Sequence, residues 1–222
     1  TARFGQGVSL MVNGTILAQG GPGDGAGIVF AGRNETPGYW SGLYLEGTNL
    51  APIGGSLLEH TTIRDGGYFM SRPANLYLYY AEASLSHATL TNGKHNGVYG
   101  GTQGVAHLSN STVSNNGVDS PEKDYAIWFT DGSVNSELSG LTLSGNSLDG
   151  VAFGPGTLST RTGRAIGYPY YLTGSQTVPW GAVLEVEPGV PVIADGTYRI
   201  SVSGRLEALG GPEHEITFTS SN

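Results

Sequence analysis

The chain has 222 residues, of which 37 are glycine and 11 are proline, and it contains no cysteine. The absence of cysteine excludes disulfides, thiol catalysis and Cys-ligated zinc sites. Only 13% of the residues are charged and the net charge is −8, so we expect no basic surface for nucleic acid. No apolar run approaches the ~18 residues of a membrane-spanning helix, and we expect no membrane insertion.

Short segments with alternating apolar and polar residues follow one another along the chain, separated by Gly, Asn, Asp and Pro. In chain order the clearest of them cover residues 9–18, 41–47, 76–81, 182–189 and 199–208. Alternation with a period of two is typical of β-strands, and no segment keeps the 3.6-residue apolar period of a helix. The sequence therefore predicts an all-β chain with many turns, for which glycine is suited because it adopts φ > 0 freely.

Four segments in the middle of the chain repeat one pattern of apolar residues and threonines. They cover residues 56–67, 84–95, 107–118 and 137–148, with spacings of 27, 23 and 30 residues. Their aligned columns are Leu58, Leu85, Leu108 and Leu138; Ile63, Leu90, Val113 and Leu143; and Thr62, Thr89, Thr112 and Thr142. A repeat this short cannot bury an apolar face alone, so neighbouring repeats must stack and share one core.

Stacked coils with like residues in columns are typical of a parallel β-helix, because equivalent positions of successive coils lie one strand spacing, about 4.8 Å, apart. A β-sandwich is the competing fold, and it does not account for the aligned columns. We therefore expect a single domain over residues 1–222, a right-handed parallel β-helix solenoid of roughly seven to nine coils.

A second, longer repeat relates the beginning of the sequence to its end. Residues 14–34 recur about 190 positions later in residues 204–222, once two residues are dropped from the turn. The matched pairs are Gly14 and Gly204, Ala18 and Ala208, Gly20 and Gly210, Gly21 and Gly211, Pro22 and Pro212, Ile28 and Ile216, Phe30 and Phe218, and Asn34 and Asn222. We interpret residues 1–34 and 191–222 as equivalent segments of two successive ~190-residue modules, with residues 156–196 continuing the solenoid as a less regular coil.

These patterns are similar to those of a known family. The glycine-rich segment at 12–34, followed by "GYWSGLYLEG" (38–47) and "SLLEHTTIRDGG" (56–67), resembles the right-handed parallel β-helices of the pectate-lyase-like superfamily. It most resembles the repeat modules of large bacterial secreted and cell-surface proteins. The resemblance implies the fold and an extracellular or cell-surface location. It fixes no function, because lyases, hydrolases, adhesins and inert stalks share this fold.

Candidate binding residues lie on the strands that precede the repeated segments. Aligning residues 42–47, 77–82, 97–102 and 126–131 places Leu43, Leu78, Val98 and Ile127 inside. The next residues then point outward as an exposed aromatic stripe: Tyr44, Tyr79, Tyr99 and Trp128, with Glu46, Glu82 and Asp131 nearby. Such stripes are typical of surfaces that stack on sugars or contact proteins. The alternative is that the loops at 66–74 or 117–124 cover these rings.

The histidines and acidic residues form no catalytic or metal-binding motif. His60 and His87 share a column with Asn110 and Gly140 at a bend, where all three residue types bond turn backbone, so we interpret this column as structural. Asp119, Glu122 and Asp124 cluster in a polar insertion that we interpret as a solvated loop. The family's lyases and hydrolases use clustered aspartates, and no motif here matches them. We expect no enzyme, with a polysaccharide lyase or glycoside hydrolase as the alternative.

Two other features have alternative interpretations. The threonine rows form a flat hydroxyl array like an ice-binding face if the coils are regular, although Arg64 interrupts the first row. The segment "GPGDGAG" (21–27) lacks the Lys-Ser/Thr of a phosphate loop and is interpreted as a turn. We expect no cofactor, apart from weak Ca²⁺ binding by acidic turns.

The function expected from these observations is structural. The chain is predicted to be a repeat module of an extracellular or cell-surface fibre, stalk or sheath with adhesive sides. It continues in a longer tandem array or stacks end to end on copies of itself. A polysaccharide-binding or polysaccharide-degrading β-helix is the first alternative, and an ice-binding β-helix is the second.

Overall fold

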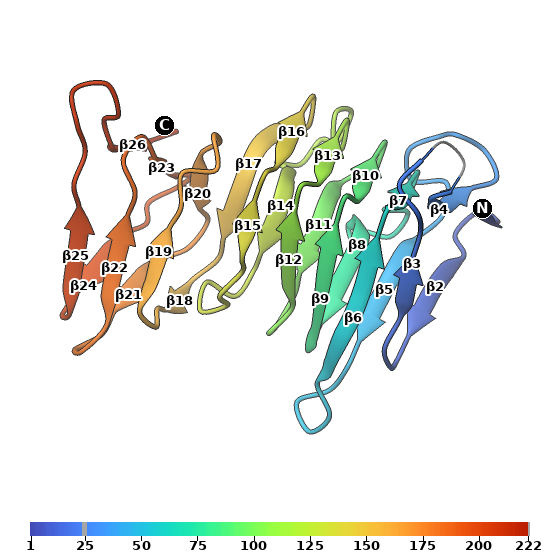
Figure 1. Cartoon of the computed structure of the whole chain (residues 1–222), viewed down its shortest axis with the longest axis horizontal. Helices are drawn as coiled ribbons and strands as arrows, with labels where there is room; N and C mark the ends of the chain where they lie inside the picture. Colours follow the sequence, from blue (N-terminus) through green and yellow to red (C-terminus); the bar gives the residue numbers. More distant parts are fainter. Residues whose placement is uncertain (24–25, 222) are drawn as a thin grey trace.

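The computed structural model describes residues 1–23 and 26–221, which form 26 short strands and no helix. The strands lie side by side along the length of the molecule, from the first coil at one end to the last at the other (Figure 1). Neighbouring strands in every sheet are parallel, and three strands complete each of about eight turns. The predicted all-β parallel β-helix is confirmed. Asp24, Gly25 and Asn222 lie outside the described residues, so the match of Asn34 with Asn222 and the centre of the 21–27 turn do too.

One sheet, which we call the long sheet, extends over the whole molecule. Its strands are β2 (Ser9–Val12), β5 (Gly42–Glu46), β8 (Ala74–Tyr79), β11 (Asn96–Gly100), β14 (Tyr125–Phe129), β17 (Leu148–Phe153), β20 (Tyr170–Leu172), β23 (Pro191–Ala194) and β26 (Thr217–Ser220). Because it is continuous, the long sheet joins the two parts of the molecule described next.

Two sheets complete the coils of the first part, β1 to β17, which we call the N-terminal stack. The six-stranded sheet contains β1 (Ala2–Phe4), β4 (Ile28–Gly32), β7 (Thr61–Arg64), β10 (Thr89–Thr91), β13 (Thr112–Ser114) and β16 (Thr142–Ser144). The five-stranded sheet contains β3 (Leu17–Gln19), β6 (Ile53–Glu59), β9 (Ala81–Ser86), β12 (Val105–Ser109) and β15 (Leu138–Ser139).

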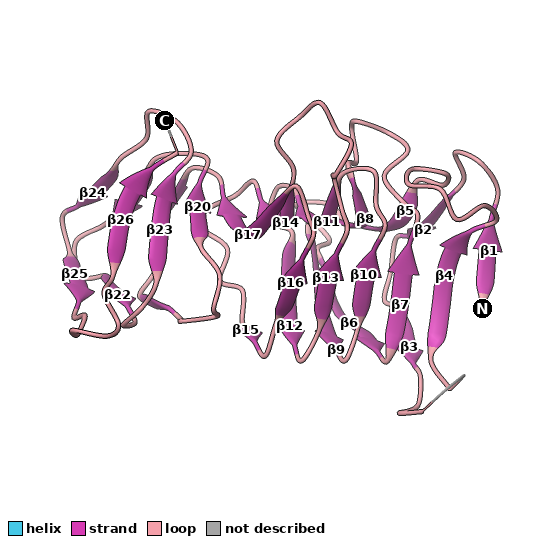
Figure 2. Ribbon diagram, turned by 90° about the horizontal axis from the view of Figure 1, so that it is seen from above, coloured by secondary structure: helices cyan, strands magenta, loops and turns pink. Residues whose placement is uncertain are grey.

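Beyond β17 these two sheets end and two short sheets replace them (Figure 2), forming the C-terminal stack, β18 to β26. The first short sheet contains β18 (Gly156–Thr157), β21 (Gln176–Val178) and β24 (Ile200–Val202). The second contains β19 (Arg161–Gly163), β22 (Val183–Val186) and β25 (Arg205–Ala208). Residues 156–196 therefore continue the solenoid, with shorter strands.

The columns predicted from the four repeated segments are observed as register pairs. The leucine column links β6, β9, β12 and β15 of the five-stranded sheet. The adjacent Ile63 and threonine columns link β7, β10, β13 and β16 of the six-stranded sheet. All members of the two apolar columns are buried, so these columns form the interior of the N-terminal stack.

Single residues in the left-handed conformation turn the chain between the sheets of the N-terminal stack. His60, His87, Asn110 and Gly140 have φ of 46°, 50°, 48° and 58° and connect the five-stranded to the six-stranded sheet. Asp65, Asn92, Asn115 and Gly145, with φ of 68°, 53°, 53° and 66°, follow the six-stranded sheet. His, Asn, Asp and Gly are the residue types that tolerate this conformation best. The interpretation of the first column as a bend is therefore confirmed.

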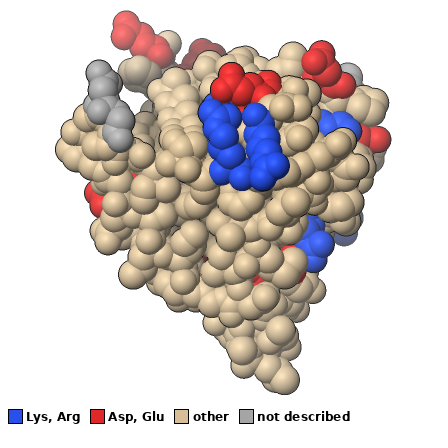
Figure 3. Space-filling model, turned by 90° about the vertical axis from the view of Figure 1, so that its right-hand side faces the viewer, with Lys and Arg blue, Asp and Glu red and all other residues tan. Residues whose placement is uncertain are grey.

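The charged side chains are few, and most of them lie at the surface, with Asp65 and Asp124 as buried exceptions. Viewed from the end with the first coils, uncharged atoms cover most of the face, and the charged groups gather near one edge (Figure 3). Arg64 lies 2.6 Å from Glu35, and Arg3 lies 3.9 Å from the same carboxylate. Exposed pairs of this kind contribute little to stability, so the apolar interior and the backbone ladders must stabilise the fold.

Candidate functional site

The outer face of the long sheet has a row of four aromatic rings, which we call the aromatic ladder. Tyr44 of β5, Tyr77 of β8, Tyr99 of β11 and Trp128 of β14 are neighbours in register. Their successive ring centroids are 5.6, 5.6 and 5.3 Å apart, and Tyr77 stacks on Tyr99 with an interplanar angle of 11°. The residue before each ring is fully buried, so the rings point outward.

The ladder contains Tyr77 where the sequence alignment placed Tyr79, and that alignment is wrong by two residues. Tyr79 pairs with Glu46, next to the ladder rather than in it. The segment "LYLYY" alternates apolar and aromatic residues, so the pattern fits two registers that differ by two residues. Tyr79 is 36% exposed and packs edge-on against Tyr80 at 4.8 Å.

One end of the ladder is covered. Tyr44 is only 1% exposed and Tyr77 only 9%, so the prediction of an exposed stripe is wrong for this end. Arg72, from the loop between β7 and β8, lies over both rings, with its guanidinium carbon 5.2 and 5.9 Å from their centroids. This is cation–π geometry. The alternative expectation, that the 66–74 loop covers the rings, is confirmed here.

Glu46 orients the arginine that covers the ladder. Both of its carboxylate oxygens accept hydrogen bonds from the Arg72 guanidinium, one of them from Nη2 at 3.0 Å. Bidentate pairs of this type are among the stronger charge-assisted interactions in proteins. Both oxygens of Glu46 therefore hold Arg72 over the rings.

The other end of the ladder is open. Tyr99 and Trp128 are both partly exposed. The indole Nε1 of Trp128 donates to Thr173 Oγ1 at 3.2 Å, and its ring lies 5.6 Å from that of Tyr125. An anchored indole beside a partly exposed phenol presents a fixed apolar surface with polar edges. That combination suits stacking on a sugar ring or on another protein.

Burial keeps the ladder phenols in their neutral form. Desolvation raises the pKa of Tyr77 to about 12, and the carboxylate of Glu46 adds to the rise. Desolvation also raises the pKa of Tyr44 and of Tyr99 above the usual value. At physiological pH these side chains therefore act as apolar faces and neutral hydrogen-bonding groups.

Asp195 fixes the loop that precedes β14 on this side of the molecule. It accepts hydrogen bonds from Lys123 Nζ at 2.5 Å, from Ser221 Oγ at 2.6 Å and from the hydroxyl of Tyr125. Burial alone raises the pKa of Asp195, but the hydrogen bonds from these three groups lower it overall. The contact ties β14 to the chain after β23, in the C-terminal stack.

Glu82 and Asp131 lie together, but on a different surface. With Tyr80 and Gln103 they line an open hollow at the turn from the long sheet to the five-stranded sheet. Glu82 lies 3.3 Å from His107 Nε2, and Asp131 accepts hydrogen bonds from the backbone N–H and hydroxyl of Ser133. None of the four ladder residues lines this hollow.

The 117–124 loop contains a buried polar cluster that sequence reasoning missed. Asp124 is 3% exposed, so the interpretation of a solvated loop is wrong for this residue, while Asp119 and Glu122 are exposed. Its carboxylate lies 3.0 Å from Nδ1 of His95, and Ser120 Oγ lies 3.2 Å from the same nitrogen. In a catalytic relay the nucleophile and the carboxylate contact opposite nitrogens of the histidine ring. Here the Ser120 hydroxyl and the Asp124 carboxylate contact the same nitrogen, so we interpret the cluster as an anchor for the loop.

A buried asparagine ladder lies beside the second set of corners. Asn116 is 1% exposed, and its amide bonds Asn75, Asn146, the Gly93 N–H and the Leu90 carbonyl at 2.8 to 3.1 Å. Asn116 and Asn146 follow Thr112 and Thr142 by four residues, so extending the aligned columns reveals this pair. Asn75 lies on β8, outside the aligned segments, so no sequence column predicts its contact with Asn116.

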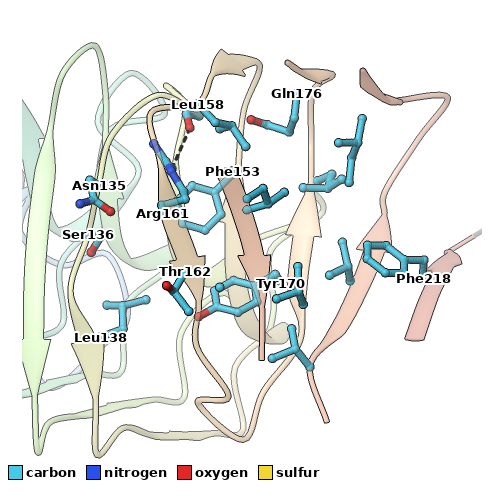
Figure 4. Close-up of a pocket in the computed structure, with 18 residues that line it drawn as sticks. Asn135, Ser136, Leu138, Phe153, Leu158, Arg161, Thr162, Tyr170, Gln176 and Phe218 are labelled. Atoms are coloured by element: carbon cyan, nitrogen blue, oxygen red, sulfur yellow. Dashed lines mark hydrogen bonds between the residues drawn. The ribbon is translucent and has the colours of Figure 1, made fainter. Parts of the chain in front are cut away.

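A cavity of about 100 Å³ begins where the two stacks meet, beside Leu138 and Phe153, and extends into the interior of the C-terminal stack (Figure 4). Leu158, Phe153 and Tyr170 contribute apolar walls. Arg161 also lines it, and its guanidinium donates to the carbonyls of Gly132, Ser133 and Val134 at 2.7 to 3.2 Å. Burial lowers the pKa of Arg161, with Asp131 opposing the shift. This region is therefore less completely filled than the N-terminal core.

The structure contains no group of three or more His, Cys, Asp or Glu side chains placed to hold a metal ion within residues 1–23 and 26–221. His60 and His87 stack on each other at 4.8 Å, at the corner described above. The predicted threonine column is in register across β7, β10, β13 and β16. In the column two residues further along these strands, Arg64 occupies the position that is Thr or Ser in the other three, and it pairs with Glu35. Ice binding and weak Ca²⁺ binding stay predictions.

A comparison with protein-family models, with curated proteins and with solved structures finds no match to this chain. The resemblance to the pectate-lyase-like superfamily therefore stays a prediction beyond the shared β-solenoid architecture. Across the described residues there is no helix with the length and apolarity needed to span a bilayer.

Proposed function

We propose that this chain is a repeat module of an extended β-solenoid, part of an extracellular or cell-surface fibre, stalk or sheath whose sides make lateral contacts. The proposal rests on how the two equivalent segments of the long repeat are packed. Strands in residues 1–34 are covered by the next coil, whereas several of their apolar counterparts in the last coil are exposed.

Three matched pairs illustrate this. Val12, Ile16 and Phe30 pack against the main core. Their counterparts Val202, Leu206 and Phe218 are 42%, 40% and 46% exposed. Each Å² of apolar surface removed from water contributes about 25 cal/mol, so covering the last coil with another coil is favourable. A solenoid that continues through the next repeat supplies such a cover, as the second coil does for the first.

The test is a chain with two repeats, in which the full chain is followed directly by its own residues 35–222. We expect one rod in small-angle scattering, longer than the single chain, with a higher urea midpoint. A matched control has a flexible Gly/Ser linker at the junction. If the direct fusion scatters like the linked control, as two jointed bodies, the proposal is wrong.

A polysaccharide-binding surface is the second candidate, and the partly exposed Tyr99 and Trp128 favour it. We expect binding in a glycan array to be lost in the double variant Tyr99→Ala and Trp128→Ala. Trp180→Ala is the control, since Trp180 is 89% exposed and lies outside the ladder. Binding that is equal in both variants excludes the ladder as the site.

A further inference from the structure

The long sequence repeat is also a repeat of structure. The matched residues make β1, β2, β3 and β4 equivalent to β23, β24, β25 and β26. Strand pairing follows the equivalence: Ala2 pairs with Phe30 in β1 and β4, and Val192 pairs with Phe218 in β23 and β26. The next pair, Arg3 with Ala31, corresponds in the same way to Ile193 with Thr219. The two pairs of strands therefore have identical register.

The equivalent strands nevertheless lie in different sheets. β1 and β4 belong to the six-stranded sheet, whereas β23 and β26 belong to the long sheet. β2 belongs to the long sheet, whereas β24 belongs to the first short sheet. Each equivalence spans 22 strands, and at three strands per coil this is seven coils and one additional strand. One repeat is thus not a whole number of coils.

We propose that successive repeats are rotated by one face of the solenoid, so that the long sheet of one repeat continues as the six-stranded sheet of the next. This inference rests on the tandem arrangement proposed above. One face of three is a rotation of about 120° per repeat, with an axial rise of about 35 Å at one strand spacing per coil. The aromatic ladder then appears on each of the three sides in turn, and the fibre has lateral contacts all round.

The rotation defines which strands cover the last coil. β4 is covered by β7, in a register that pairs Val29 with Thr62. β26 is therefore covered by the β7 of the next repeat, with Thr217 beside its Thr62. β3 is covered by β6, with Leu17 beside Leu57. β25 is therefore covered by the next β6, with Glu207 beside its Leu57.

The absence of cysteine makes cross-linking a direct test on the two-repeat chain. Two matched variants combine Thr217→Cys with Thr62→Cys of the second repeat, and Glu207→Cys with Leu57→Cys of the second repeat. Two swapped variants exchange the partners, Thr217→Cys with Leu57→Cys and Glu207→Cys with Thr62→Cys. Val29→Cys with Thr62→Cys in the single chain is the positive control, since that pair is adjacent in the structure.

We expect a short bifunctional thiol reagent to cross-link the matched variants and the positive control, and to leave the swapped variants largely unlinked. Cross-linking of the swapped variants, or of none, in a chain that scatters as one long rod overturns the rotation but not the fibre. A chain that scatters as two jointed bodies overturns the tandem arrangement and the rotation with it.

Discussion

The N-terminal and C-terminal stacks follow the same winding path, but they are stabilised in different ways. Among the described residues, the main core of the N-terminal stack contains 25 buried apolar residues, whereas the C-terminal stack has two clusters of three buried residues each and borders a cavity. The corners differ as well. All eight non-glycine residues with positive φ in the described chain lie between His60 and Asn115, and the positive-φ corners of the C-terminal stack are glycines.

Coils of equal topology therefore need not be equally stable. A His or Asn at a corner costs some backbone strain, but its side chain stacks on or hydrogen-bonds the corresponding residue of the next coil. A glycine avoids the strain and contributes no side chain. We therefore expect the N-terminal stack to be the more stable part and the C-terminal stack to unfold first.

Truncating a leucine in each interior compares how well the two stacks are filled. Leu90→Ala in the filled core should lower the free energy of unfolding by about 4 kcal/mol, at the upper part of the range for buried leucines. Leu184→Ala, beside the cavity, should cost only about 2 kcal/mol, because Leu184 is partly exposed and borders space that is already empty. Urea denaturation measures both, and equal losses would contradict the comparison.

The next effect concerns the buried amides. Asn116→Ala should cost about 3 kcal/mol, because it removes the side-chain acceptor of the Gly93 N–H and one hydrogen bond each from the Leu90 carbonyl, Asn75 and Asn146 in a buried site. Gln176→Leu in the C-terminal stack should cost about 1 kcal/mol. Gln176 donates mainly to the Gly154 carbonyl, its Oε1 has no hydrogen-bond partner among the described residues, and leucine adds apolar volume to the cavity. Similar losses would show that the asparagine ladder is not a stabilising feature.

A pH effect is expected from the aromatic ladder, which the N-terminal stack provides. Because burial raises the pKa of Tyr77 to about 12, the neutral phenol stabilises the fold fully below the unfolded pKa near 10. That stability is lost as the pH rises from 10 through 12. The urea midpoint of the native chain should therefore fall more steeply over this range than that of Tyr77→Phe. Parallel curves would contradict a buried phenol at this position.

The smallest effect tests the corners. Asn110→Ala must place a Cβ in the left-handed conformation, whereas Asn110→Gly need not, so the alanine variant should be less stable by about 1 kcal/mol. Both variants lose the same side-chain contacts, and their difference isolates the backbone term. Equal stabilities would mean that the corner relaxes when the side chain is removed.

Much of the fold was predictable because stacking repeats the same local environment in every coil. The columns that begin at Leu58 and Ile63 correctly predict the strand register of the five-stranded and six-stranded sheets, since the spacing between the two columns allows only one alignment of the four repeated segments. Tyr79 was misplaced because a strand with apolar residues at alternate positions fits more than one register. The two sheets that end after β16 were not predictable, since no aligned column marks the change.

Less of the candidate site was predictable, because it depends on loops. Arg72 covers Tyr44 from a loop of nine residues, and nothing in the sequence relates the two positions. His95 and Asp124 are 29 residues apart and belong to different loops. Such contacts have no periodicity, whereas the corner residues repeat with the coil. Asn116 and Asn146 are an intermediate case: they repeat with the coil, and extending the threonine column by four residues would have predicted this pair.

The orientation of the backbone hydrogen bonds has a mechanical consequence. In a stack of parallel coils these bonds point along the long axis of the stack, so tension on the two ends would separate neighbouring strands one after another rather than shear a whole sheet at once. A coil of about 23 residues would then release about 80 Å of extended chain as it peels away. In single-molecule pulling, such a protein yields in small, regular steps at low force, beginning with the sparsely packed coils.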